Sequence, residues 1–170
     1  MSKAFTRESD DAPELPNRPR RISSLPPGTK NYLTTGGAQR LRHELNDLLN
    51  SERPRLATLS EDDAAKLRLA ALDDRVSQIE ETLRTAFVVE TPPAPHDQVR
   101  FGATVTVRHR RGEETHYRIV GVDETDIDRD WISWLSPIAR ALLNARTGQN
   151  VRIKLPTGDD ELAIIAIRYE

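Results

Sequence analysis

Three consecutive acidic residues, Glu61, Asp62 and Asp63, are the strongest candidates for chemistry in this sequence. Mg²⁺ prefers oxygen ligands, so neighbouring carboxylates can direct a metal, and Glu61 and Asp62 are the candidate metal ligands. The same segment has a structural interpretation, because Ser60 and Asp63 have the spacing of a capping box and acidic side chains favour the first turn of a helix. Both interpretations stay open, since a capped turn would still expose Glu61 and Asp62 to solvent.

Other polar residues do not form a recognisable site. A second acidic series alternates as in a Ca²⁺-binding loop, but it lacks the central glycine and the final glutamate of an EF-hand. The histidines have no spacing to an acid or a serine that suggests a catalytic triad, so we expect surface or strand positions for them. The chain has no cysteine, which excludes a thiolate metal site or nucleophile. The acidic series is Asp123, Glu124, Asp126, Asp128 and Asp130, and the histidines are His43, His96, His109 and His116.

The composition indicates a folded chain without a strong charge bias. Of its 170 residues, 31% are charged and 36% apolar, and the formal net charge is −2. No apolar run approaches the roughly 20 residues that cross a membrane, and the first residues carry charges where a signal peptide would be apolar. We therefore expect a cytoplasmic protein that makes no membrane contact. No segment has the basic excess that drives sequence-independent binding to nucleic acid, so a protein is the expected direct partner.

Residues 32–90 have the pattern of two amphipathic helices. Apolar residues recur at intervals of three and four from Ala38 to Leu48, and again from Leu69 to Ala86. The segment 57–63 is long enough only for a tight reversal, so the sequence predicts an antiparallel helical hairpin, or coiled coil. Pro54 interrupts the first arm, where its missing N–H predicts a kink or the start of a new helical segment.

The rest of the chain divides into three further segments. Residues 1–31 are rich in proline and mildly basic, and this composition predicts a disordered tail. Prolines in residues 91–98 should end the second helix and form a stiff linker. From residue 99 to 170 the apolar period becomes two, which indicates short strands of an antiparallel sheet, while Ser136 as N-cap and Pro137 at the first helical position predict one short helix. The predicted fold class is α+β.

Several short motifs resemble the bacterial GreA/GreB family of transcript-cleavage factors, more closely its GreB branch. The resemblance covers about residues 31–170. In the C-terminal part the motifs are Tyr-Arg-Ile-Val-Gly at 117–121, Asp-Glu at 123–124, Ser-Pro-Ile-Ala-Arg-Ala-Leu-Leu at 136–143 and Gly-Gln at 148–149. In the predicted hairpin they are Thr-Thr-Gly-Gly-Ala at 34–38, Glu-Leu at 44–45 and Glu-Arg-Pro at 52–54.

This resemblance implies a fold and a function. The C-terminal domain would be similar to FK506-binding proteins, without their isomerase role, and would grip the rim of the secondary channel of RNA polymerase. The coiled coil of a monomeric factor would enter the channel, where Glu61, Asp62 and Asp63 at its tip would help to hold a Mg²⁺ of the polymerase and orient water on backtracked RNA. The factor would need no cofactor of its own and would not be an enzyme, because the polymerase is the catalyst.

Two tryptophans and the predicted short helix are candidates for contact with this partner. Trp131 and Trp134 are three residues apart in a predicted strand and should lie on opposite faces, one in the core and one exposed. Partner docking through Trp131, Trp134, Ser136, Pro137 and Arg140 is therefore one hypothesis. Packing of the tryptophans in the core is the alternative.

The predicted tip departs from the family pattern. Leu-Ser-Glu at 59–61 matches it, but Asp62, Asp63 and Ala64 replace the following Asn-Ala-acid, and no Gly-Asp precedes. The hairpin is also shorter than the family's by about a dozen residues. Divided between two arms, about six residues at 1.5 Å each would withdraw the tip by roughly 9 Å. Three functions stay open: stimulation of RNA cleavage, regulation by a non-cleaving factor that competes with Gre factors, and an adaptor role on another protein.

Overall fold

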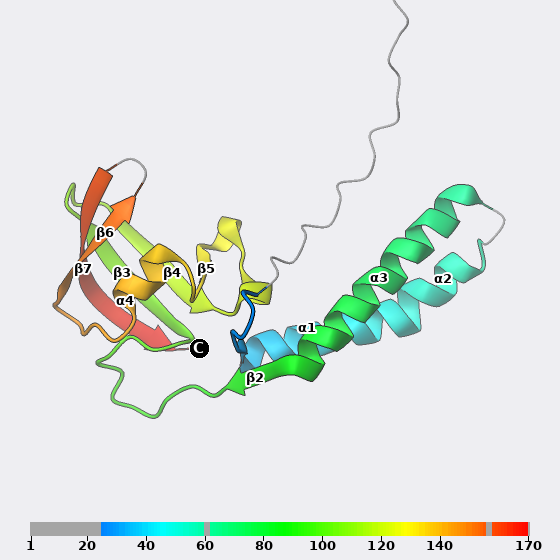
Figure 1. Cartoon of the computed structure of the whole chain (residues 1–170), viewed down its shortest axis with the longest axis horizontal. Helices are drawn as coiled ribbons and strands as arrows, with labels where there is room; N and C mark the ends of the chain where they lie inside the picture. The colour runs from blue at the N-terminus through cyan, green and yellow to red at the C-terminus, as the bar shows by residue number, and fades with distance from the viewer. Residues whose placement is uncertain (1–24, 60–61, 156–157, 170) are drawn as a thin grey trace, which may run out of the picture.

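The computed structural model describes residues 25–59, 62–155 and 158–169, and places a helical part beside a sheet (Figure 1). Apart from one short helix, the α-helices precede the strands of the main sheet in the chain, as in an α+β protein. Most of the predicted tail, residues 1–31, lies outside the described residues. In the described ranges, no helix combines the length and the apolar character that a bilayer crossing requires.

The first helical arm changes its helix type before a proline. It consists of α1 (Thr35–Asp47), η1 (Leu48–Glu52), which is a π-helical turn, and α2 (Arg53–Ala57). Pro54 has no N–H, and its ring would collide with the carbonyl four residues earlier in a regular α-helix. The wider π turn before Pro54 removes this conflict. The new segment that begins at Arg53 agrees with the interpretation of Pro54 from sequence.

The second arm, α3 (Asp63–Thr85), lies alongside the first (Figure 1). Its buried side chains recur every three or four positions toward its second half: Leu72, Val76, Ile79 and Thr82. Ile79 is fully buried in a cluster with Leu41 of α1 and Leu33. Arg75 of α3 donates two hydrogen bonds to the carboxylate of Glu44 on α1, at 2.7 and 2.9 Å. Apolar burial and a bidentate ion pair therefore hold the arms together.

Two strands at the base of the arms are absent from the sequence-based prediction. β1 (Asn31–Thr34) and β2 (Ala86–Val89) pair in parallel, with Asn31 opposite Ala86. The predicted helix through Ala86 is therefore wrong after Thr85. Ala86 adopts an extended backbone, because the aromatic and β-branched residues that follow favour a strand and β1 supplies the backbone partners that a local pattern cannot reveal.

The main sheet has five strands in the order β5-β4-β3-β7-β6. Neighbouring strands are antiparallel except for β4 and β5, which are parallel. The prediction of a purely antiparallel sheet is therefore wrong at β5. Two short 3₁₀ turns connect β4 to β5 and return the chain alongside β4, so that β5 runs parallel to β4. The elements are β3 (Ala103–His109), β4 (Glu114–Val120), η2 (Val122–Glu124), η3 (Ile127–Arg129), β5 (Trp131–Ser133), β6 (Asn150–Leu155) and β7 (Gly158–Tyr169).

One short helix, α4 (Pro137–Leu142), packs on this sheet (Figure 1). Ser136 caps it, because its hydroxyl oxygen accepts the N–H of Ala139 at 3.1 Å, and Pro137 occupies the first helical position as predicted. Ala139 and Leu142 are fully buried in the core of the sheet. The capping residues thus fix where the helix starts, and the apolar residues fix which face it buries.

Ile79 should contribute strongly to stability, because it joins both arms to β1. Ile79→Ala is expected to lower the free energy of unfolding by about 2–5 kcal/mol, the usual range for such a truncation in a core. Leu67→Ala on the same helix is the matched control, since Leu67 is 60% exposed. Urea unfolding followed by circular dichroism would measure both variants. Equal losses for the two would contradict this description of the core.

Candidate functional site

The candidate acidic site lies at the turn between the two arms. Asp62 is the N-cap of α3, and its carboxylate accepts the N–H of Ala64 at 3.0 Å. The interpretation of Ser60 and Asp63 as a capping box is therefore wrong, because Asp62, one position before the helix, has the extended backbone and the acceptor that a cap requires. Ser60 and Glu61 lie outside the described residues.

Asp63 presents an accessible carboxylate at this turn. Its side chain is 95% exposed and pairs with Lys66 at 2.9 Å. Asp62 keeps one carboxylate oxygen that takes no part in the cap. The tip therefore presents carboxylate oxygens to solvent and also uses one of them to cap a helix, with Asp62 as the capping residue. In the described part of the chain, no group of three potential ligands is arranged to hold a metal ion.

A buried carboxylate connects the arms to the sheet. Glu124 of η2 has a side chain that is only 2% exposed. It accepts hydrogen bonds from the N–H of Thr34 at 2.8 Å, from the Thr34 hydroxyl, from the N–H of Gly121 at 3.1 Å and from the guanidinium of Arg40 at 3.3 Å. Burying a charge is costly unless it is paired and hydrogen-bonded, and these four donors satisfy that requirement. We call this set of residues the junction.

Thr34 links the junction to the start of the first arm. It ends β1, donates to Glu124, and accepts the N–H of Gly37 at 2.9 Å as the N-cap of α1. The hydroxyl thus donates in one direction and accepts in the other, as a hydroxyl can. The position of the sheet and the start of α1 therefore depend on the same side chain.

Two glycines allow the close approach at the junction. A Cβ on Gly37 would overlap the carboxylate of Glu124, and one on Gly121 would overlap the backbone oxygen of Tyr32. Glycine is the residue that permits such close contact. Gly37 and Gly121 belong to two motifs that are far apart in the sequence, so these motifs meet in the folded chain.

The acidic series between residues 123 and 130 does not form a Ca²⁺ loop. Its members point to different partners: Asp123 accepts from Asn31 at 3.3 Å and from Thr82 at 3.2 Å, while Glu124 is buried in the junction. Asp126 accepts the N–H of Asp128 and begins η3. These acids therefore organise the connection between the two parts of the chain.

Trp131 lies beside the junction with three guanidinium groups around its ring. Arg40, Arg118 and Arg129 lie 4.6, 4.8 and 5.4 Å from the ring centroid, within the range of cation–π attraction. Burial lowers the pKa of Arg40, Glu124 opposes this shift, and the neighbouring arginines add to it. Trp131 is thus half-buried in a polar setting rather than in the apolar core.

The other predicted docking residues lie along the following segment. Trp134 is half-buried, packs on the core of the sheet and contacts Tyr32 at 5.1 Å between ring centroids. Ser136 serves as the cap of α4, and Pro137 and Arg140 are exposed on that helix. Neither tryptophan is fully buried or fully exposed, so the predicted division into one core ring and one surface ring is wrong. The physical reason is that the strand ends at Ser133, and Trp134 lies in the turn that follows.

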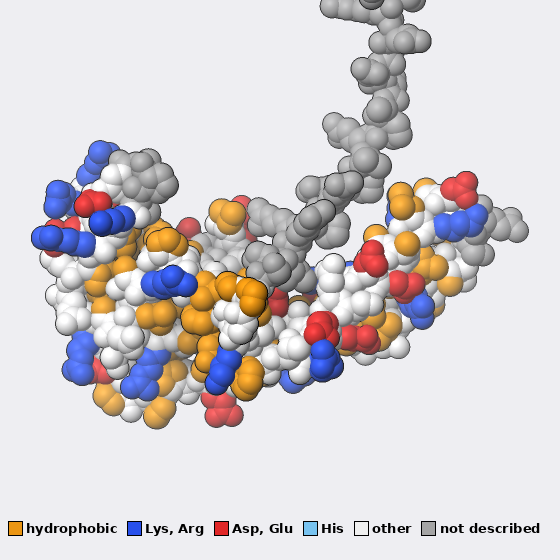
Figure 2. Space-filling model, viewed as in Figure 1, with side chains coloured by type: hydrophobic (Ala, Val, Ile, Leu, Met, Phe, Trp, Pro, Cys, Tyr) orange, Lys and Arg blue, Asp and Glu red, His pale blue; other side chains and the backbone are white. Residues whose placement is uncertain are grey.

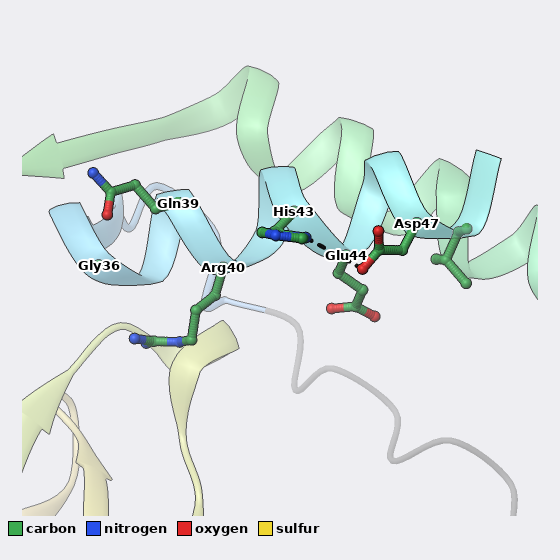
Figure 3. Close-up of a pocket in the computed structure, with 7 residues that line it drawn as sticks. Gly36, Gln39, Arg40, His43, Glu44 and Asp47 are labelled. Carbon is green, nitrogen blue, oxygen red and sulfur yellow. Dashed lines mark hydrogen bonds and ion pairs between the residues drawn. The ribbon is translucent and has the colours of Figure 1, made fainter. Parts of the chain in front are cut away.

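An open groove of about 580 Å³ runs along α1 next to the junction (Figure 3). Figure 3 shows Arg40 pointing from this helix toward the segment that carries η2, and His43 next to Asp47. His43 Nδ1 lies 3.2 Å from Asp47 Oδ2. The residues that line the groove all lie between positions 36 and 48 of the first arm, and the groove is open. It therefore suits contact with another surface better than enclosure of a small molecule. Sequence reasoning missed this groove, although the residues that line it are close together in the sequence.

One histidine has partners that the sequence spacing did not reveal. His109 Nδ1 lies 2.7 Å from Asp160 Oδ2, and His109 Nε2 lies 3.2 Å from Thr115 Oγ1. These residues belong to β3, β7 and β4, so the imidazole ties three adjacent strands together. Asp160 is 51 positions from His109, and only the antiparallel pairing of β3 with β7 brings them together. His109 is a strand residue, as predicted, and its contacts are those of a structural clamp.

Residues 94–169 match the family model described as "Transcription elongation factor, GreA/GreB, C-term". Among curated proteins, GreB of Neisseria meningitidis serogroup A is 37% identical over 155 residues, which cover 83% of this chain and 95% of that protein. GreA of Trichlorobacter lovleyi is 36% identical over 152 residues, which cover 81% of this chain and 96% of that protein. These proteins are transcription elongation factors, and this chain belongs to the GreA/GreB family.

Solved structures of the same family also match. The GreA/GreB factor of Nitrosomonas europaea is 25% identical with a TM-score of 0.42, and the match covers 82% of this chain and 100% of that one. GreA factor homolog 1 of Thermus thermophilus is 26% identical with a TM-score of 0.40, and the match covers 82% and 99%.

The matched part of this chain is shorter than its relatives. The alignment with the Neisseria GreB is 155 residues long, but it includes only 83% of the 170 residues of this chain, which is about 141. About 14 residues of that relative therefore have no counterpart in this chain.

Loss of the Glu124 carboxylate should destabilise the junction. Glu124→Ala leaves buried donors of Thr34 and Gly121 without an acceptor, and we expect the free energy of unfolding to fall by about 3 kcal/mol. Asp128→Ala, at an exposed acidic position of the same segment, is the matched control. Chemical denaturation would measure both. A loss no larger than that of the control would show that the junction does not depend on Glu124.

Asp160 should stabilise the sheet only while it is ionised. The hydrogen bond from His109, followed by that from the N–H of Glu161, holds the pKa of Asp160 below its usual value of 3.8. The unfolded chain regains the usual pKa, so the stabilisation is complete above about pH 3.8 and is lost as the pH falls through the lower folded pKa. Asp160→Asn should therefore lower the urea midpoint at neutral pH, and the difference from the unaltered protein should disappear in strong acid. A difference that does not change with pH would contradict a role for the charge.

Proposed function

We propose that this protein binds RNA polymerase in the cytoplasm as a monomeric elongation factor that acts through the secondary channel. The observation that supports this function most directly is the family membership over both parts of the chain. The sheet part, with the fold similar to FK506-binding proteins that the family resemblance implies, would dock on the channel rim. Trp131, Trp134, Ser136, Pro137 and Arg140 are the docking residues of this proposal.

The helical arms would form the antiparallel coiled coil that enters the channel. Each arm extends over 23 residues, from Thr35 to Ala57 and from Asp63 to Thr85, which corresponds to about 35 Å of helix. The arms are anchored at their base by the junction and carry carboxylates at the opposite end. A rigid projection with an acidic end is the geometry that can bring oxygen ligands to a metal inside another protein.

Stimulation of RNA cleavage is the first mode of action in this proposal. Glu61, Asp62 and Asp63 would add carboxylates to a Mg²⁺ held by the polymerase and would orient water toward a phosphodiester of backtracked RNA. The tip offers too few described ligands to hold the ion alone, so the ion would belong to the polymerase. The polymerase would remain the catalyst, and the factor would position oxygen atoms.

Competition without cleavage is the second mode, and the length of the matched segment favours it. About 14 missing residues, if divided between two arms, would withdraw the tip by roughly 10 Å at 1.5 Å per residue. This distance is large compared with a metal–oxygen bond of about 2.1 Å. Such a factor would occupy the channel, exclude cleaving Gre factors and leave the RNA intact.

A cleavage assay on a backtracked elongation complex separates the two modes. If the tip reaches the metal, the protein should shorten the RNA, and the double variant Glu61→Gln, Asp62→Asn should slow cleavage at least about tenfold, which corresponds to about 1.4 kcal/mol. Asp74→Asn, at an exposed position in the middle of α3, is the matched control and should cleave normally.

The remaining outcomes of this assay are also informative. Binding to polymerase with displacement of a cleaving Gre factor, but without shortened RNA, would establish the competitor. Failure to bind the polymerase would refute the proposed function and would favour an adaptor role on another protein.

A further inference from the structure

Four aromatic rings gather where the arms meet the sheet, and we call them the aromatic patch. Phe87, Phe101 and Trp134 surround Tyr32 at centroid distances of 6.3, 5.8 and 5.1 Å. Figure 2 shows hydrophobic side chains collected on this side of the molecule, over the base of the arms and the neighbouring part of the sheet. The patch combines Tyr32 of β1, Phe87 of β2 and the loop residues Phe101 and Trp134, so the fold assembles it from four segments of the chain.

The patch is incompletely covered by the described residues. Phe87 is large and apolar, yet it is 53% exposed, while the next residue of the strand, Val88, is 44% exposed on the opposite face. β2 has β1 as its strand partner in the described sheets. Exposed aromatic side chains that adjoin one another are a feature of surfaces that bind a partner. The junction, the tip and the groove along α1 make no use of Phe87 or Val88.

The N-terminal segment of the chain enters the described structure at this patch. Thr29 donates its N–H to the carbonyl of Pro26 at 3.0 Å, which forms a turn directly before β1. The ammonium group of Lys30 lies 5.1 Å from the ring centroid of Phe87. Any segment that precedes Leu25 is therefore tethered close to the exposed rings.

The sequence before this turn has prolines at a regular interval of three. Residues 13–19 read Pro-Glu-Leu-Pro-Asn-Arg-Pro. A polyproline II helix has three residues per turn, so Pro13, Pro16 and Pro19 would share one face of it. Such segments bind aromatic surfaces with little loss of entropy, because proline restricts the backbone in advance. We propose that residues 13–19 bind the aromatic patch of the same chain.

The tether allows this contact. Five residues separate Pro19 from Leu25, and an extended chain covers about 3.3–3.6 Å per residue, so Pro19 can reach roughly 20 Å from Leu25. Prolines three apart lie about 9 Å from each other along a polyproline II helix, which is comparable with the extent of the rings around Tyr32. Lys30 at the edge of the patch also provides a cation for Glu14, the acidic residue of the segment.

The tether also compensates for a weak intrinsic affinity. A short flexible connection gives an effective concentration in the millimolar range. A segment that would bind in trans with a dissociation constant of about 100 μM would then be bound for most of the time. The bound segment would cover Phe87 and occupy the surface around the docking residue Trp134.

Paramagnetic relaxation provides the test, because the chain has no cysteine and a single one can be labelled. A nitroxide attached to Asn17→Cys should reduce the amide peak intensities of Tyr32, Phe87 and Phe101 at least about twofold, while the amide of Gly112 at the far turn of the sheet should be unaffected. Replacing the three prolines by serine should restore the peaks. Phe87→Ser should also restore them, whereas Leu67→Ser, an exposed apolar residue on the arm, should not.

Two results would overturn the proposal. The first is equal peak intensity at the patch and at Gly112, or broadening that survives the loss of all three prolines. The second is broadening that arises only between molecules, seen when isotope-labelled protein is mixed with spin-labelled unlabelled protein. The proline variant alters no described residue, so its result does not depend on whether Phe87→Ser folds.

Discussion

The carboxylate of Glu124 is buried at the point where the helical arms meet the sheet, and its need for hydrogen-bond donors constrains the residues around it. Two of its donors come from Thr34, one from Gly121 and one from Arg40. An isolated buried charge would be far too costly, so these groups must be in place together. Thr34 in turn caps α1, and the start of the first arm is therefore fixed by a residue 90 positions further along the chain.

This arrangement has a mechanical consequence for the proposed function. The arms are held to each other by Ile79 and by the Arg75–Glu44 pair, and they are held to the sheet by the junction. An acidic tip at the end of a long projection is useful only if its base does not move, because metal coordination tolerates errors of only a few tenths of an ångström. The close approach at Gly37 and Gly121 leaves little space for such movement.

The chemistry that the tip can perform depends on its reach as much as on its residues. In the proposed function, Asp62 and Asp63 would supply oxygen atoms to a magnesium ion, even though Asp62 also caps α3. Arm length decides whether those oxygens arrive, and this chain is shorter than the GreB relative over the matched segment. In the proposed function, the acidic end and the shorter matched segment favour different modes of action. The cleavage assay distinguishes these modes.

The sequence by itself determined the features that depend on neighbouring residues. The two apolar stripes, the change of helix type at Pro54 and the capped start of α4 follow from local periodicity, from a missing N–H and from a serine before a proline. Tertiary structure alone decided the parallel pairs β1–β2 and β4–β5, the burial of Glu124 and the contact of His109 with Asp160. Each of these features joins segments that are far apart in the chain. The sequence around a carboxylate does not show whether that group will be exposed to solvent or buried among four hydrogen-bond donors. The physical reason is that backbone pairing and desolvation depend on which groups the whole fold brings together, and no local pattern contains that information.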